Sequence, residues 1–304
     1  MLVVLAVIWG GSVPLTKLGL RSFPPLTLTA LRYLVAAPFF LAMLRGRPLP
    51  PPRVLAQAAG LGVLGIVVGQ VAQTLGVADT SASVATVISA LIPVLVVAIG
   101  AVRLRQPLSG RQALGLAVAF AGVALVATGD PRRLASLASL AGTDRGRGDA
   151  LMVLSAVAVA LYYVLSVPLV TRYSVVTVAA LTSLAGAAGL VPIAWWELRR
   201  TPVHPSVLGV AVVFYLALLV TVLGLWIWFG ALSRLPVRVA AALQYLQPLV
   251  GVGASAALFG DALGAWFWIG TGLVLAGIAA TAAGRRVLPA TSPPGPGPRP
   301  AGAR

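Results

Sequence analysis

Cysteine is absent from this chain of 304 residues, and histidine occurs only once, at position 204. Without cysteine there are no disulfides, no thiolate metal sites and no cysteine nucleophiles. His204 lies in the loop segment 201–205 and has no second imidazole with which to share a metal ion. An enzyme would need paired acids, a histidine or a metal cluster. We therefore expect no metal, no cofactor and no catalytic residue.

Acidic residues are also scarce. The chain has these six: Asp79, Asp130, Asp144, Asp149, Glu197 and Asp261. Charged residues make up 9% of the chain and hydrophobic residues 59%, whereas a soluble domain carries roughly 25% charged residues to keep its surface in water. A globule of this size could not be solvated by so few charges, so the composition implies that the solvent is the lipid bilayer.

The net charge of +16 comes from arginine, with Lys17 as the single lysine. Clustered cations can neutralise nucleic-acid phosphates, but most of these arginines lie in short gaps between apolar runs. They resemble the loop charges that orient membrane proteins, and we expect no nucleic-acid partner. With both termini cytoplasmic, the cytoplasmic loops and tail hold 13 of the 22 cations. Four of these lie in the tail, so the loops alone hold nine cations on each side of the membrane. We place both termini on the cytoplasmic side of the cell's inner membrane.

A spanning helix needs about 20 predominantly apolar residues, and the chain contains ten such runs. They are 2–20, 26–44, 54–77, 81–102, 110–128, 149–171, 175–196, 206–232, 237–259 and 262–283. Met1–Trp9 has no basic segment before it and no small-residue cleavage site after it, so it reads as a retained helix and not as a signal peptide. Its abrupt start leaves open that a few residues precede Met1.

The second half of the chain repeats the first. A shift of 155 residues places Ser83–Gly129 on Arg238–Gly284 with about thirteen of 47 positions identical, including Pro93 on Pro248. The predicted organisation is a first five-helix repeat at 1–129, a polar connection at 130–148, a second five-helix repeat at 149–284 and a disordered tail rich in Pro and Arg at 285–304.

Five helices is an odd number, so the second half must enter the membrane from the side opposite to the first. The fold class that we expect is an all-α polytopic membrane protein, with ten transmembrane helices in two inverted five-helix repeats. This architecture recurs in secondary transporters, whose substrate site lies near the midplane between the repeats. The repeat therefore favours a permease or exporter for a small organic solute, working by alternating access.

Several short motifs carry a family resemblance in the order in which they occur. They are Trp9-Gly10, Pro24-Pro25 and Arg32, then 79–85 leading to Pro93, then Ala231-Leu232-Ser233-Arg234 and Tyr245-Leu246-Gln247-Pro248. Together they resemble the EamA-type permeases of the drug/metabolite transporter superfamily, over nearly the whole span 2–284. The resemblance implies ten helices, cytoplasmic termini and the export or uptake of small metabolites. The family usually has a Glu after its fourth and ninth helices, where this chain has Gln106 and Asp261.

Polar side chains within the apolar runs are the candidates for substrate contact, because they are costly in hydrocarbon unless they face a cavity or a partner. Ser83, Thr86 and Ser89 share one face of the fourth run, and either line a cavity or bond to a neighbouring helix. The residues that we expect to contact the substrate are Trp9, Gln70, Gln73, Ser89, Tyr162, Trp228, Gln244, Tyr245 and Gln247.

Prolines and two cations complete the predicted site. Pro14, Pro93, Pro168 and Pro248 occupy matched places in the two halves and are predicted hinges, although membrane helices also tolerate proline structurally. Lys17 and Arg32 lie within apolar runs, where they either attract an anionic group of the substrate or extend to the lipid headgroups.

The acids lie in loops or at helix ends, where we expect their charge to be solvated. We therefore expect downhill transport or exchange without obligatory proton coupling. The partners are a small-molecule substrate and the bilayer, and a homodimer is left open. The alternative function is a membrane sensor or scaffold that does not transport.

Overall fold

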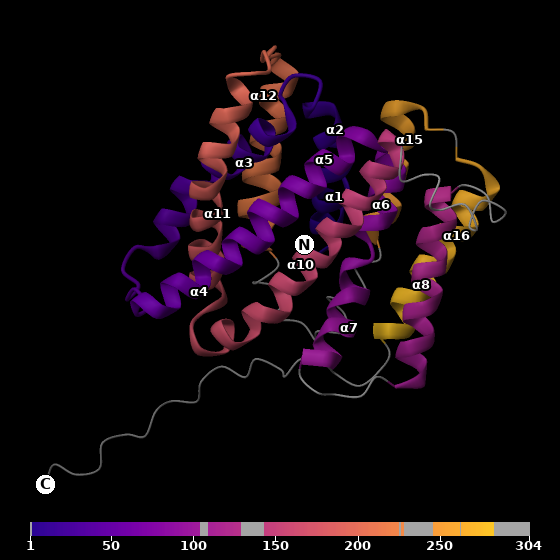
Figure 1. Ribbon diagram of the computed structural model, residues 1–304, viewed down its shortest axis with the longest axis horizontal. Coiled ribbons are helices and arrows are strands. Elements are labelled where there is room, and N and C mark those ends of the chain that lie inside the picture. The colour runs from indigo at the N-terminus through magenta and orange to yellow at the C-terminus, as the bar shows by residue number, and fades with distance from the viewer. Residues whose placement is uncertain are drawn as a thin grey trace, which may run out of the picture.

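The computed structural model describes residues 2–103, 109–128, 143–224, 226–227, 246–261 and 263–282. Every regular element in these segments is a helix, and the helices pack side by side as a bundle (Figure 1). The elements up to residue 128 are α1 (Leu2–Gly10), α2 (Ser12–Gly19), α3 (Pro25–Leu44), α4 (Pro52–Gly62), η1 (Val63–Gln70), α5 (Val71–Asp79), α6 (Ala82–Ser89), α7 (Ile92–Arg103) and α8 (Gly110–Thr128). Those after residue 143 are α10 (Asp144–Arg172), α11 (Val175–Leu198), α12 (Val207–Phe214), η3 (Tyr215–Leu223), α15 (Leu246–Phe259) and α16 (Ala265–Ala282). The predicted all-α class is confirmed.

The apolar helices coincide with the predicted runs. Five are long and apolar enough to cross a membrane: Pro25–Leu44, Pro52–Asp79, Ala82–Arg103, Asp144–Arg172 and Val175–Leu198. Five shorter apolar helices accompany them in the described part of the chain: Val3–Gly19, Gly110–Val126, Val207–Leu223, Gln247–Phe259 and Ala265–Ala280. One boundary is corrected, because α10 begins at Asp144 and not at 149. The Thr143 hydroxyl accepts a hydrogen bond from the Gly146 amide (3.0 Å), and this cap starts the helix within the predicted connection.

Two of the predicted hinge prolines follow interruptions in a spanning helix. The first span breaks at Gly11, between α1 and α2, and the third residue of α2 is Pro14. The fourth span breaks between Ser89 and Ile92, immediately before Pro93. Proline has no N–H for the carbonyl four residues earlier, which accounts for both interruptions. Pro168, the repeat mate of Pro14, lies instead within the continuous helix α10.

Two spanning helices contain π-helical turns at related places. η1 runs from Val63 to Gln70 between α4 and α5, and η3 runs from Tyr215 to Leu223 after α12. These helices are the third and the eighth spanning helices, which the sequence repeat pairs with each other. π-Helical turns occur frequently at functional sites.

The helices of the two halves pair with one another. α3 packs against α11, α6 against α15, and α8 against α16; α8 and α16 lie side by side in Figure 1. The α8–α16 contact is very close. A Cβ atom on Gly122 would lie 2.6 Å from the carbonyl oxygen of Gly270, and one on Gly277 would lie 2.5 Å from that of Gly115.

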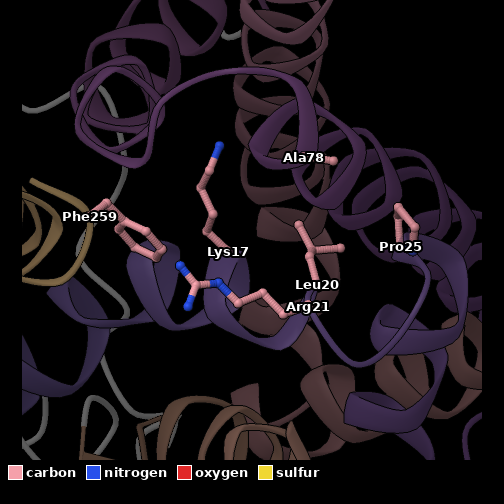
Figure 2. A pocket seen from close by; sticks show the side chains of 6 residues that line it. All are labelled: Lys17, Leu20, Arg21, Pro25, Ala78 and Phe259. Carbon is pink, nitrogen blue, oxygen red and sulfur yellow. The ribbon is translucent and has the colours of Figure 1, made fainter. Parts of the chain in front are cut away.

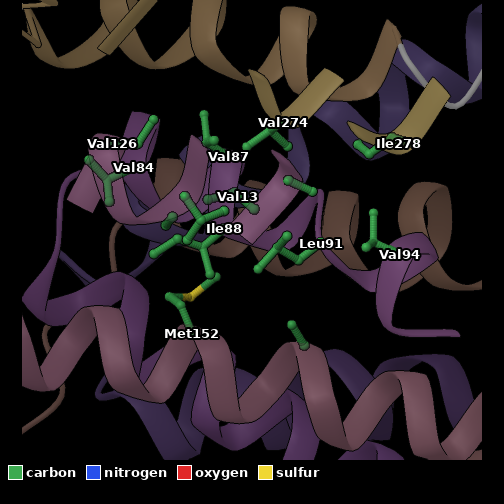
Figure 3. Packing of buried hydrophobic residues seen from close by; sticks show 14 of the residues in the cluster. Val13, Val84, Val87, Ile88, Leu91, Val94, Val126, Met152, Val274 and Ile278 are labelled. Carbon is green, nitrogen blue, oxygen red and sulfur yellow. The ribbon is translucent and has the colours of Figure 1, made fainter. Parts of the chain in front are cut away.

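The largest apolar core surrounds α6. Val84, Val87 and Ile88 of this helix pack with Met152 of α10 and Val274 of α16, and also with Val126 of α8 in their own half (Figure 3). The core therefore holds the two halves together around α6.

Candidate functional site

Arg32 forms the centre of a polar cluster inside the spanning region. It is the eighth residue of α3, which at a rise of about 1.5 Å per residue places its Cα roughly 10 Å along the helix from Pro25. Its Nε donates a hydrogen bond to Thr221 Oγ1 (2.8 Å), and its Nη1 donates one to Gln70 Oε1 (3.1 Å). Because Gln70 ends η1 and Thr221 lies in η3, the guanidinium connects the two π-helical segments.

The acceptors of Arg32 are neutral. The ion pairs found among the described residues both belong to Arg147. An arginine remains protonated in proteins, so this cation lies within the helix bundle without a carboxylate partner among those residues. The Arg32 side chain is half-buried and bonds to side chains of neighbouring helices; its attraction of an anionic group of the substrate stays a prediction.

Trp9 and Tyr215 attach the broken first span to η3. The Trp9 indole N–H donates to the Val220 carbonyl (2.9 Å), and the Tyr215 hydroxyl donates to the Ile8 carbonyl (2.8 Å). A Cβ atom on Gly224 would lie against the indole nitrogen, so a larger residue there would displace the ring. The Trp9 indole therefore binds the carbonyl of the residue that precedes Thr221, in the same region as Arg32.

Gln73 and Tyr162 lie beside this cluster. Gln73 is half-buried, one turn beyond Gln70. The Tyr162 hydroxyl is 3.0 Å from Thr182 Oγ1, and the ring lies against Gly65 of η1. The absence of a side chain at Gly65 therefore allows α10 to pack closely against η1.

Two hydroxyl groups of the predicted polar face of α6 donate within their own helix. The hydroxyl groups of Thr86 and Ser89 donate to the carbonyls of Ala82 and Ala85 in the same helix (2.8 and 2.9 Å). Each of these hydroxyl oxygens can still accept a hydrogen bond, so contact of Ser89 with the substrate stays a prediction. A Cβ atom on Gly251 would lie 2.5 Å from Thr86 Cγ2, so this face packs against α15.

The remaining predicted site residues lie on or near α15. Gln247 is half-buried, and its carbonyl oxygen is close to Gly10, where α1 ends. Pro248 is buried near the start of α15. Trp228, Gln244 and Tyr245 lie outside the described residues, as does Gln106.

Lys17 lies in a pocket at the end of the bundle that carries the α5–α6 turn, residues Asp79–Ser81, which we name the α5–α6 end. The pocket has a volume of about 310 Å³ (Figure 2), and its lining residues are Lys17, Leu20, Arg21, Pro25, Ala78 and Phe259. Lys17 Nζ donates to the carbonyls of Val77 (3.1 Å) and Thr80, and Arg21 lies 5.5 Å from the centre of the Phe259 ring. The ammonium thus binds carbonyls at the C-terminus of α5, where the helix dipole favours a cation.

Polar links join the two halves at the α5–α6 end. Thr80 donates to Asp149 Oδ1 (2.6 Å), and Arg147 pairs with Asp79 (2.8 Å). The Ser83 amide, at the start of α6, donates to Asp261 Oδ2 (3.1 Å). The acid that follows the ninth span therefore caps a helix of the first half. These links hold the halves together on this side.

Two carboxylates differ from the prediction that every acid is solvated. Asp149 and Glu197 are only 8% and 7% exposed. Both lie near a helix end, as predicted, but neighbouring helices cover them. Glu197 accepts hydrogen bonds from the amide of Leu26 (3.2 Å) and from the amide and hydroxyl of Thr27 (both 2.7 Å). Backbone and hydroxyl donors therefore replace water around its charge.

Thr221 and Thr80 were not predicted as functional residues. Thr221 is the one threonine in the apolar run 206–232, and a polar side chain at that place is the signal that could have pointed to it. Thr80 stands in a turn, and its contact with Asp149 depends on how the sixth span packs, which the sequence does not give.

Comparison with known proteins identifies the family. The model of the EamA-like transporter family matches residues 1–128 and 146–283. An uncharacterized transporter of Archaeoglobus fulgidus is 26% identical, over 89% of this chain and 93% of its own. The uncharacterized inner membrane transporter YedA of Escherichia coli K12 is 24% identical, over 94% and 90%.

Two further matches bear on function and fold. A protein of Streptantibioticus cattleyicolor named a probable terminal-alkyne amino-acid exporter is 29% identical, over 91% of this chain and 90% of its own. A solved crystal structure has the same fold, with a TM-score of 0.63 and 19% identity, over 92% of this chain and 94% of that one. With the family model matching nearly the whole chain, this multi-pass membrane transporter belongs to the EamA-like transporter family.

Proposed function

We propose that the protein is a secondary carrier that moves a small organic solute across the cytoplasmic membrane by alternating access between two inverted five-helix halves. The observation that carries this proposal is the Arg32 cluster, in which Gln70 of the first half and Thr221 of the second bind one guanidinium inside the bundle. A solute bound there would contact both halves at once.

The pairing of the helices supports the inverted repeat. Gly115 and Gly122 of α8 are repeat mates of Gly270 and Gly277 of α16. Gly115 meets Gly277 and Gly122 meets Gly270, and this reciprocal pattern is typical of a two-fold axis between equivalent elements. The two segments matched by the family model, 1–128 and 146–283, also correspond to the two halves.

The links at the α5–α6 end support alternating access. Asp149–Thr80, Asp79–Arg147 and Asp261–Ser83 must separate when that end opens and can re-form when it closes. With both termini cytoplasmic, this end faces outward. The transport would then be downhill or exchange, because the described acids lie near helix ends and not at the depth of Arg32.

Flux into proteoliposomes tests the proposal. The purified protein is reconstituted and offered labelled amino acids, nucleobases and cationic drugs, with protein-free liposomes as the baseline. We expect at least one solute to enter faster than the baseline, and Gln70→Leu to slow its entry several-fold. Gln57→Leu, at an exposed position of α4, is the matched control and should leave flux unchanged. Baseline uptake of the whole panel would contradict transport by this protein.

A further inference from the structure

We propose that Arg32 binds the carboxylate of the transported solute, which makes the substrate a small organic carboxylate with an apolar or aromatic body, zwitterionic amino acids included. The inference rests on the proposed carrier function and names the substrate class for the same site. It predicts that a carboxylic acid is carried and that its amide is not.

The guanidinium of Arg32 has an incomplete set of hydrogen-bond partners. An arginine side chain has five N–H donors, and among the described residues only Gln70 and Thr221 accept from it, at Nη1 and Nε. Both acceptors are neutral, although an intramembrane cation is costly and is usually paired. A solute carboxylate would supply the negative charge.

The geometry of the Arg32 guanidinium suits a carboxylate. The planar guanidinium presents its N–H groups as a fork that matches the two oxygens of a carboxylate. Lys17 differs in this respect, because its ammonium binds the carbonyls of Val77 and Thr80 at a helix C-terminus. Of the two cations predicted within apolar runs, Arg32 is therefore the one suited to bind an organic acid.

Aromatic residues lie near Arg32. The Tyr33 ring centre lies 5.4 Å from the guanidinium carbon, and the Trp9 indole is attached to η3 next to Thr221. The Tyr33 ring is buried in an apolar core, whereas Trp9 is half-buried, and an aromatic surface such as that of Trp9 favours an apolar or aromatic body attached to the carboxylate. The oxygen of the Gln70 side chain can accept from a second polar group, such as an ammonium.

Binding of a carboxylate to Arg32 would affect how the two halves are linked. A carboxylate bound to the Nε and Nη2 side of the guanidinium would compete with Thr221 for the Nε donor. Because Arg32 belongs to the first half and Thr221 to the second, the solute would replace a direct link between the halves by a link through itself. Substrate binding would thereby favour their rearrangement.

The experiment compares matched acids and amides on the full chain in proteoliposomes. The probes are labelled L-phenylalanine and L-leucine with L-phenylalaninamide and L-leucinamide, each corrected for protein-free liposomes. The proposal predicts at least tenfold faster entry of an acid than of its amide. Arg32→Gln should reduce acid entry at least tenfold, Arg32→Lys should retain part of it, and Arg53→Gln, at an exposed position of α4, should leave it unchanged.

The outcomes separate the two proposals. Equal entry of acid and amide in the wild-type protein would refute carboxylate recognition, and so would unchanged acid entry in Arg32→Gln. The wild-type comparison decides the matter even where the Arg32 variants do not fold. Carriage of nucleobases or cationic drugs without carriage of acids would refute this inference and leave the carrier function standing. Failure to carry any of these solutes would refute the carrier function itself.

Discussion

The buried carboxylate of Glu197 shows how this chain stabilises an acid that has no cationic partner among the described residues. Its two oxygens accept from the amides of Leu26 and Thr27 and from the Thr27 hydroxyl, at the first turn of α3. A carboxylate is favourable at a helix N-terminus, where the free N–H groups and the dipole are positive. Glu197 thus caps α3 from α11 and joins the second half to the first.

Removing this cap should destabilise the protein. We expect Glu197→Ala to lower the free energy of unfolding by about 1–3 kcal/mol, because the N–H groups of Leu26 and Thr27 lose their acceptor. Glu197→Gln retains one acceptor oxygen and should cost less. Thermal unfolding of the purified protein in detergent measures the effect, and an Ala variant that melts with the wild-type protein would contradict the capping role.

At the scale of the helix, the prolines and glycines have opposite effects on the flexibility of the bundle. Pro93 follows the break between α6 and α7, whereas Gly122 and Gly270 allow α8 and α16 to come into contact. The first feature favours bending, and the second favours a rigid contact.

Replacing Pro93 tests the hinge. Pro93→Ala restores an N–H that can donate to the Ser89 carbonyl, and an interior proline costs a helix roughly 3 kcal/mol. We therefore expect a continuous, stiffer helix, several-fold slower solute flux and an unchanged or higher melting temperature. Pro38→Ala, at an exposed position within α3, is the control. Wild-type flux in Pro93→Ala would show that bending there is not required.

A side chain at the α8–α16 contact should destabilise the bundle. A Cβ atom on Gly122 would lie 2.6 Å from a backbone oxygen, which cannot rotate away. We expect Gly122→Ile to lower the free energy of unfolding by about 1–3 kcal/mol or more. Gly253→Ile is the control, because nothing lies within 4 Å of a Cβ atom there. Equal melting temperatures for the two variants would contradict this close contact.

The elements differ in how far the sequence predicts them. The spans were predictable because each must place about 20 apolar residues in hydrocarbon, and the breaks before Pro14 and Pro93 follow from a missing N–H. The π-helical turns η1 and η3 were not predictable, since each depends on a local shift of hydrogen bonding within an apolar run. The partners of Arg32 and Asp149 were also inaccessible, because helices far apart in sequence supply them.

At the scale of the whole molecule, the proposed inverted repeat predicts which loops share a side of the membrane. Reporter fusions at Asp79, Ala141 and Arg200 should respond as external, and fusions at Arg47 and Arg105 as cytoplasmic. Five spans separate a loop from its equivalent in the other half, so equivalent loops, such as those at Arg47 and Arg200, must lie on opposite sides. The same response from fusions at Arg47 and Ala141 would contradict the inverted arrangement.

Alternating access is the central claim, and counterflow measures it most directly. Proteoliposomes are preloaded with an excess of the unlabelled form of the best solute of the flux panel, then diluted into a trace of the labelled form. A carrier that exposes one site alternately to each side brings labelled solute in. Its site then returns outward occupied mostly by the unlabelled solute, which is in excess inside. We therefore predict that labelled solute accumulates transiently above its equilibrium level, with no pH gradient applied. Labelled solute that only approaches equilibrium, at the same rate in preloaded and empty vesicles, would contradict alternating access.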